Sequence, residues 1–341
     1  MSDDRDEPFP LLPITSAETL RKCASLPLRS KDVFVTSFPK SGTTWMQHIV
    51  HTLATNGESP LPHISDACPF FEVDRTWDAA SDALAPTVVA NHDKIGCRIF
   101  NTHLRWSMMP KSSPEARYVY MTRRAVDACV SFYHHLSHQS AEDGGFRGDL
   151  DEFIGTWTSG TVFFGSWSAH LASWLPAAAA DERILVVSYE ELRARPRELV
   201  GRVNAHCGFG LSDARLDELV PRFAFDWMRA HEAQFEPRSV KWVKPAAALK
   251  PAPPASAADG GASAVGAKRP RAAGAGEGEE GEEGGEGEQL FHFIRAGRVG
   301  DGDAAFGPEH RAALRAMALR TYGSPDQVPA AVAALLPAQL L

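Results

Sequence analysis

Apolar runs of strand length alternate along this chain with segments of helical spacing. The strand-like runs cover residues 33–38, 98–102, 117–122 and 183–188. Helical patterns follow the first run to about Ala54 and the third from about Ala125 to Leu136, and further amphipathic segments follow the fourth run. Such alternation predicts an α/β fold, a single P-loop-like domain with a central parallel sheet flanked by helices.

Polar residues stand just past the ends of three of these predicted strands. They are Lys40, His103 and Arg123. Ligands of parallel sheets bind outside the carboxyl ends of the strands, and those ends share one edge of the sheet. We therefore expect the three side chains to meet at one rim.

The most informative of these junctions reads Phe-Pro-Lys-Ser-Gly-Thr-Thr-Trp over residues 38–45. A strand that breaks at such a sequence and restarts as a helix is typical of a phosphate-binding loop. Gly42 permits the tight turn, the first helical amides lack partners, and Lys40 adds a positive charge. The lysine precedes the glycine, so the loop is not the Walker sequence G-x-x-x-x-G-K-[ST]. A plain strand-to-helix turn with a solvated lysine is the alternative.

Composition limits the classes of partner. A chain of 341 residues with a net charge of −8 argues against a general nucleic-acid or anionic-membrane partner. Its five cysteines show neither metal-ligand spacing nor a disulfide framework, which favours a reducing compartment. The acidic N-terminus lacks the pattern of a signal peptide, and no apolar run reaches membrane-spanning length. We expect a cytoplasmic protein.

Residues 246–289 interrupt the pattern, since they are rich in Gly, Ala, Pro and Glu and contain no aromatic residue. Such a segment buries too little apolar surface to offset its ordering entropy, so we expect a disordered insertion. Its basic stretch, residues 268–271, also permits a reading as a nuclear import signal, although a solvated linker is favoured. The predicted domain therefore comprises residues 29–245 and 290–341, after an N-terminal extension, residues 1–28, that is poorly ordered in part.

The loop sequence Pro-Lys-Ser-Gly-Thr-Thr-Trp resembles the 5′-phosphosulfate loop of the cytosolic sulfotransferases, which use PAPS (3′-phosphoadenosine 5′-phosphosulfate) as donor. Arg123, followed eight residues later by Ser131, resembles the 3′-phosphate motif of that family. Residues 293–301 resemble its C-terminal closing segment, and Ile184–Leu192 resembles the segment whose tyrosine lies near the adenine. The resemblance implies cofactor contacts from Lys40, Ser41, Gly42, Thr43, Thr44, Trp45, Arg123, Ser131, Tyr189, Arg295, Ala296 and Gly297.

The sequence Asn101-Thr102-His103-Leu104 resembles the family motif whose histidine is the general base. The resemblance implies in-line sulfuryl transfer from PAPS, with PAP as product and without a metal ion. His103 would take the acceptor proton, and Lys40 would stabilise the leaving phosphate. A neutral histidine suits the first role because its ordinary pKa lies near neutrality.

Three positions depart from the family pattern. Asn101 stands where relatives usually have a lysine near the transferring group, and Ala296 also replaces a lysine. Gly302 replaces a tryptophan, and we expect that loss to loosen the closing segment. A degenerate family member that binds nucleotide but turns over poorly therefore remains an alternative. So does a P-loop phosphotransferase that uses ATP and magnesium.

Acceptor recognition is indicated less directly. Phe70, Phe71 and Trp77 resemble the region that lines the family's acceptor pocket, although ordinary core packing explains them equally well. His135 stands at a position that is often aromatic in relatives, which favours a more polar acceptor. With Asn101, these residues form the predicted substrate-binding set. We expect a small-molecule acceptor and a monomer or weak homodimer.

Overall fold

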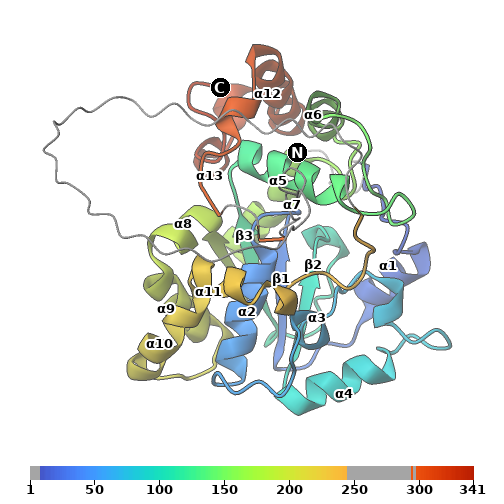
Figure 1. Cartoon of the computed structure of the whole chain (residues 1–341), viewed down its shortest axis with the longest axis vertical. Coiled ribbons are helices and arrows are strands. Elements are labelled where there is room, and N and C mark those ends of the chain that lie inside the picture. The colour runs from blue at the N-terminus through green and yellow to red at the C-terminus, as the bar shows by residue number, and fades with distance from the viewer. Residues whose placement is uncertain (1–7, 244–292, 295–296) are drawn as a thin grey trace, which may run out of the picture.

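The computed structural model describes residues 8–243, 293–294 and 297–341 (Figure 1). Its strands are β1 (Asp32–Ser37), β2 (Arg98–Thr102), β3 (Arg117–Thr122) and β4 (Ile184–Ser188). Its α-helices are α1 (Ala17–Ser25), α2 (Thr43–Ala54), α3 (Ile64–Ala67), α4 (Pro86–Ile95), α5 (Ala125–Ser137), α6 (Leu150–Ser159), α7 (Trp167–Ala180), α8 (Tyr189–Ala194), α9 (Pro196–Cys207), α10 (Asp213–Leu219), α11 (Phe225–Ala230), α12 (Pro308–Tyr322) and α13 (Ala330–Ala333).

The four strands form one parallel sheet in the order β2-β1-β3-β4. The predicted α/β fold is thereby confirmed. Two strand limits differ slightly from those expected, because Phe38 lies beyond the end of β1 and Arg183 lies before the start of β4. Phe38 instead packs edge-on against Phe132 and Trp157, in a cluster next to the sheet.

Alternation along the strands divides the core into two layers. Val33 and Val35 of β1 join the cluster formed with α2, α9 and α10, whereas Phe34 joins the cluster that contains Trp174 of α7. Successive side chains of a strand point to opposite faces, so a strand that is buried along its whole length must be covered on both sides. Figure 1 shows helices on either side of the sheet.

A third cluster lies beyond the sheet and joins α5, α6 and α7 to the C-terminal helices. Trp157 and Trp167 are fully buried there, together with Leu314 of α12. Figure 1 shows α12 beside α6, whose first residue lies 158 positions earlier in the sequence. The cluster therefore fixes α5, which leads away from the end of β3.

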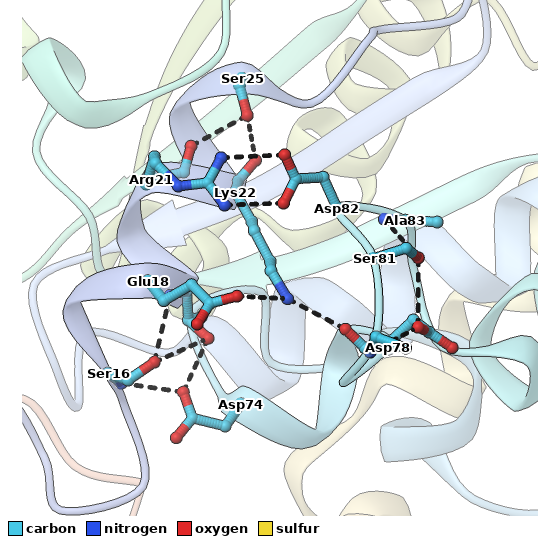
Figure 2. Close-up of polar contacts among 12 residues, drawn as sticks. Ser16, Glu18, Arg21, Lys22, Ser25, Asp74, Asp78, Ser81, Asp82 and Ala83 are labelled. Atoms are coloured by element: carbon cyan, nitrogen blue, oxygen red, sulfur yellow. Dashed lines mark hydrogen bonds and ion pairs between the residues drawn. The ribbon is translucent and has the colours of Figure 1, made fainter.

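Polar contacts fasten α1 to the loop that follows residue 73 (Figure 2). Asp74 accepts hydrogen bonds from the Ser16 amide at 2.8 Å and the Thr19 hydroxyl at 2.7 Å. The buried Lys22 donates to the Asp78 carbonyl at 2.9 Å and pairs with Glu18 at 3.1 Å. Because α1 also packs in the cluster around Phe34, this part of the predicted N-terminal extension is structured. Residues 1–7 lie outside the described residues.

The predicted insertion, residues 246–289, falls within the stretch 244–292, which lies outside the described residues. The division of the domain around it therefore stays a prediction. Across the described ranges, no helix combines the length and the apolar character that crossing a bilayer requires.

Candidate functional site

The predicted residues at the strand ends meet at one edge of the sheet. Lys40 follows β1, His103 follows β2, Arg123 follows β3 and Tyr189 follows β4. Strand register aligns these ends, since Thr36 pairs with Thr102 and Ser37 with Met121, while Thr122 pairs with Ser188. Residues separated by up to 149 positions thus share one rim.

The loop between β1 and α2 has the backbone shape that a phosphate cradle needs. Gly42 has φ +97° at the start of α2, and a Cβ there would lie 2.8 Å from the Tyr189 ring. No side chain caps α2, so its first amides remain available as donors. The hydroxyls of Ser37 and Thr43 lie 2.7 Å apart and tie the loop to the strand.

Arg123 is a buried cation without a carboxylate partner among the described residues, and only 8% of its surface is exposed. Its Nη1 donates to the Lys40 carbonyl at 2.7 Å, and its guanidinium lies 4.3 Å from the centre of the Tyr189 ring. Its Nε is buried and has no hydrogen-bond partner in the described part of the chain. A buried guanidinium that is incompletely paired favours binding of an anion at this point.

A cavity of about 120 Å³ gathers most of the residues predicted to bind nucleotide. Arg123, which follows β3, and Ser131, on α5, both line this cavity, so the two residues lie on one wall system as expected. The other lining residues are Lys40, Thr44, Trp45, Tyr189, Phe225, Met228, Phe293, Ile294 and Gly297. The Trp45 indole donates to the Phe223 carbonyl at 2.9 Å, which fixes that ring at the cavity wall.

Asp127 anchors the closing segment. This fully buried side chain accepts hydrogen bonds from the amides of Gly300 at 2.9 Å and Gly302 at 2.8 Å. A Cβ on Gly302 would lie 2.4 Å from the Val126 carbonyl, so no larger residue fits here. The expected loosening of the closing segment stays a prediction, and at Gly302 itself the backbone packs closely against α5. The predicted cofactor residues Arg295 and Ala296 lie outside the described residues.

His103 is fixed by hydrogen bonds on three sides. Its Nδ1–H donates to the Ser37 carbonyl at 2.8 Å, which leaves Nε2 as the acceptor of the neutral ring. Its amide donates to Glu72 at 2.6 Å, and its carbonyl accepts from His170 Nε2 at 3.0 Å. Tyr120 in turn lies 2.9 Å from His170 Nδ1. These contacts present Nε2 of His103 as a proton acceptor.

Burial and charge keep His103 neutral. Burial lowers the pKa of its imidazole to about 4, the nearby Lys40 ammonium lowers it further, and the Ser37 carbonyl opposes both effects. Burial raises the pKa of Glu72 to about 7, against the hydrogen bonds from His103 and Thr102. Glu72 was not identified from the sequence, because nothing there distinguishes it from a surface carboxylate.

A second cavity, of about 350 Å³, holds His103 and most of the predicted substrate residues. Phe70, Asn101 and His135 line it, and Phe70 packs edge-on against the His103 ring at 5.3 Å. Phe71 is wrongly assigned to this lining: it is fully buried and packs on Phe34 and Phe100. Trp77 likewise lies in that core and donates to the Phe71 carbonyl. Of these three aromatic residues, one lines the cavity.

Lys40 lies where the two cavities meet. Lys40, Thr44 and Phe293 line both cavities. The Lys40 ammonium donates to His135 Nδ1 at 3.3 Å and lies 4.4 Å from the centre of the Phe293 ring. One cation therefore faces the anion-binding cavity on one side and His103 on the other. Within the described residues, no cluster of three or more His, Cys, Asp or Glu side chains is arranged to hold a metal ion.

Comparison with known sequences identifies several relatives of this chain. Sulfotransferase 1B1 of the dog is 28% identical over 207 residues, which cover 59% of this chain and 67% of the relative. Human sulfotransferase 2B1 is 30% identical over 211 residues, 60% of this chain and 53% of the relative. Human sulfotransferase 1C2 is 26% identical over 226 residues, 64% and 73% of the two chains.

Solved structures share the fold at low sequence identity. Mouse sulfotransferase 7A1, crystallised with PAP, matches with a TM-score of 0.61 and 18% identity over 94% of both chains. Retinol dehydratase, crystallised with androsterone and PAP, matches with a TM-score of 0.61 and 16% identity over 91% of this chain and 85% of its own. The sequence model of the sulfotransferase domain matches residues 30–245, more than half of the chain, and the chain therefore belongs to the sulfotransferase family.

Proposed function

We propose that this sulfotransferase moves a sulfuryl group from PAPS to a hydroxyl or amine of a small molecule. The observation that carries the proposal is the meeting of two cavities at Lys40. One is lined by the buried Arg123, which has no carboxylate partner among the described residues, and the other by the proton-accepting His103. Group transfer needs donor and acceptor on opposite sides of the reacting atom, and this geometry provides both.

The smaller cavity suits a nucleotide with two anionic groups. The uncapped amides of α2, that of Thr43 included, with Lys40 and the Thr44 hydroxyl, would hold the 5′-phosphosulfate. Arg123 and Ser131 would hold the 3′-phosphate, with the amide of Gly297 on the same wall. Tyr189 and Trp45 offer aromatic surface to the adenine. Mouse sulfotransferase 7A1 and retinol dehydratase were crystallised with PAP, which supports this choice of nucleotide.

In the reaction, the acceptor oxygen or nitrogen attacks sulfur in line with the phosphate oxygen that leaves. The new bond to sulfur forms as the sulfur–oxygen bond to phosphate breaks. His103 Nε2 takes the acceptor proton, and the Lys40 ammonium stabilises the negative charge that develops on the departing phosphate oxygen. The products are PAP and the sulfated acceptor.

The larger cavity combines apolar and polar walls. Phe70, Phe132 and Phe164 favour a flat or apolar acceptor body, while Asn101 and His135 provide hydrogen-bonding groups. Retinol dehydratase was crystallised with retinol and with androsterone, acceptor-like molecules that bear one hydroxyl on an apolar skeleton. We expect acceptors with additional polar groups to be preferred over simple phenols.

The test is transfer of labelled sulfate from PAPS to a panel of phenols, alcohols, steroids, amines and sugars. We expect turnover in the wild type and a loss of at least about 100-fold in Lys40→Ala and His103→Ala. Binding of PAP without turnover of any acceptor would instead identify a degenerate member. Binding of ATP with magnesium, and not of PAPS, would overturn the proposal. Preference for simple phenols would overturn the inference about acceptor polarity alone.

A further inference from the structure

Helix α7 holds the backbone of the loop that follows β2 and begins with His103. Its His170 donates through Nε2 to the His103 carbonyl at 3.0 Å, and its Trp174 indole donates to the Leu104 carbonyl at 3.0 Å. The two donors stand four residues apart, so they share one face of the helix. Both side chains are fully buried. The loop has left the sheet at this point, so these side chains pair with carbonyls that a neighbouring strand does not.

A third contact from the same face of α7 continues this arrangement. The Ser173 hydroxyl accepts a hydrogen bond from the Trp106 amide at 2.9 Å. No residue of α7, a helix that the structure describes in full, lines either cavity. The helix therefore reaches the site through the backbone of this loop, and not through the cavity walls.

The protons along this chain of contacts have one consistent arrangement. A carbonyl can only accept, so Nε2 of His170 carries the proton and Nδ1 is the acceptor of the neutral ring. The Tyr120 hydroxyl lies 2.9 Å from Nδ1 and donates to it. Burial lowers the pKa of His170 to about 3, against the effect of its bond to His103, and raises the pKa of Tyr120 well above its ordinary value. Tyr120 thereby keeps its proton and fixes His170 as a donor toward His103.

His103 is thus held on both sides of its own backbone. Its amide donates to Glu72 at 2.6 Å, and its carbonyl accepts from His170. Its ring is bound separately, because Nδ1–H donates to the Ser37 carbonyl at 2.8 Å. The remaining ring nitrogen, Nε2, is the proton acceptor, and these three contacts set its position in the larger cavity.

We propose that His170 is a positioning residue for the transfer reaction: its Nε2–H, aimed by Tyr120, fixes the His103 carbonyl and so holds His103 Nε2 at the acceptor hydroxyl or amine. The inference rests on the proposed function. A general base must stand within hydrogen-bonding distance of the proton that it takes, and a displacement of about 1 Å can cost about 100-fold in rate. Without the His170 donor a buried carbonyl is left unpaired, and the loop gains by moving until that carbonyl finds another partner.

The principal variant is His170→Phe, which keeps a ring against Tyr120 and Phe38 but removes the donor. We expect the single-turnover rate of sulfate transfer to fall at least about 10-fold, with the PAP dissociation constant changed less than about threefold. A single turnover is measured because product release can hide a change in the transfer step. His170→Gln places an N–H near the position of the lost Nε2 and should recover part of the rate.

His92→Phe is the matched control. His92 is likewise a buried histidine on a helix, and it donates through Nε2 to a backbone carbonyl, that of Ile99, at 3.1 Å. Its loss should lower the denaturation midpoint as the loss of His170 does, yet leave the transfer rate within about twofold of the wild type. The comparison separates lost stability from lost positioning.

A transfer rate of His170→Phe within about twofold of the wild type would overturn the proposal. An equal loss of rate in His92→Phe would do the same, since general destabilisation would then explain both. In the nucleotide-free wild type, nitrogen-15 NMR should show the Nε2–H tautomer of His170, and an Nδ1–H tautomer contradicts the role whether or not the enzyme turns over. Absence of any sulfate transfer by the wild type would instead refute the proposed function and this role together.

Discussion

At the scale of single residues, the site depends on ionisable groups that the fold buries. His103 and His135 are held neutral, and Glu72 is driven toward its protonated form. The Nε of Arg123 is buried and has no hydrogen-bond partner in the part of the chain that the structure describes. These environments separate a proton acceptor, His103, from an anion-binding group, Arg123, on one rim. A residue's type alone does not predict which role it takes.

Glu72→Gln should stabilise the protein in a pH-dependent way. The Glu72 carboxyl has a pKa of about 7 in the folded protein and 4.5 as its ordinary value. Between those values the unfolded chain releases a proton that the folded protein retains, so folding becomes less favourable as pH rises. Glutamine still accepts the His103 amide and carries no charge. The free energy of unfolding of Glu72→Gln should therefore exceed that of the wild type only slightly at pH 4.5, and the difference should reach its full size above pH 7.

Urea denaturation of both proteins at pH 5 and pH 8 measures this difference. Glu115→Gln, at an exposed position, is the control and should show no comparable growth with pH. If the stability difference between Glu72→Gln and wild type is the same at both values, Glu72 is not the buried acid that the structure shows.

At the scale of elements, the site is assembled by connections between segments distant in sequence. Asp127, in the first turn of α5, holds the amides of Gly300 and Gly302. Arg124 pairs with Asp303 at 2.8 Å and so adds a second link to the same segment. The closing segment is thereby joined to the helix that starts at the anion-binding strand end.

Asp127→Asn should loosen this connection. Asparagine keeps one acceptor oxygen but turns an NH₂ group toward the second amide, so one charge-assisted bond is lost. Such bonds contribute about 1.5–3 kcal/mol, and we expect a loss of that order in the free energy of unfolding. Amide hydrogen exchange at Gly300 and Gly302 should accelerate.

Asp303→Asn is the matched control, because that carboxylate is 41% exposed and exposed ion pairs contribute at most about 1 kcal/mol. Hydrogen-exchange mass spectrometry and urea denaturation report both effects. Unchanged exchange in Asp127→Asn would show that other contacts hold the segment.

At the scale of the whole molecule, buried histidines make the fold sensitive to acid. Burial lowers the pKa of His48, His51, His92 and His103 to about 4, and that of His170 to about 3. All five titrate near 6.5 in an unfolded chain, so below that pH the unfolded chain binds protons that the folded protein excludes. Stability should fall steeply from pH 6.5 toward 4. Glu72 has the opposite effect on stability, but it is a single group and does not offset the effect of the five histidines.

Denaturant midpoints measured between pH 7.5 and 5 test this expectation. The slope of the unfolding free energy against pH gives the number of protons taken up on unfolding. In His51→Gln that number should be smaller by about one, since one titrating group is removed. A midpoint that stays constant from pH 7.5 to 5 would be incompatible with five buried neutral histidines.

The predicted insertion, residues 246–289, should be dispensable for the fold. The rings of Trp242 and Phe293, on either side of it, lie 6.3 Å apart, so a short linker can reconnect the chain. Replacing residues 250–288 with a short Gly-Ser linker should leave turnover within twofold. It should raise stability by about 1 kcal/mol, because closing a shorter loop costs less entropy. A clear fall in turnover or in PAP affinity would show instead that the insertion acts on closure or product release.

Local pattern was enough to determine much of this protein. Strand and helix limits were predicted to within one or two residues at β1, β2, β3, β4 and α5, because periodicity reflects the burial of each element. The positions of Lys40, His103 and Arg123 also followed, since parallel strands bring their carboxyl ends to one edge.

Only the tertiary structure decided the rest, because it depends on contacts between distant segments. Phe70 and Phe71 look alike in the sequence, yet one lines the cavity and the other fills the core, as neighbours on a chain can face opposite sides. The burial of Glu72, the fit of Gly302 against α5 and the contact between Lys40 and His135 all require the folded chain. The sequence by itself thus determined which residues reach the rim. Packing decided the protonation state of each side chain and the groups that it contacts.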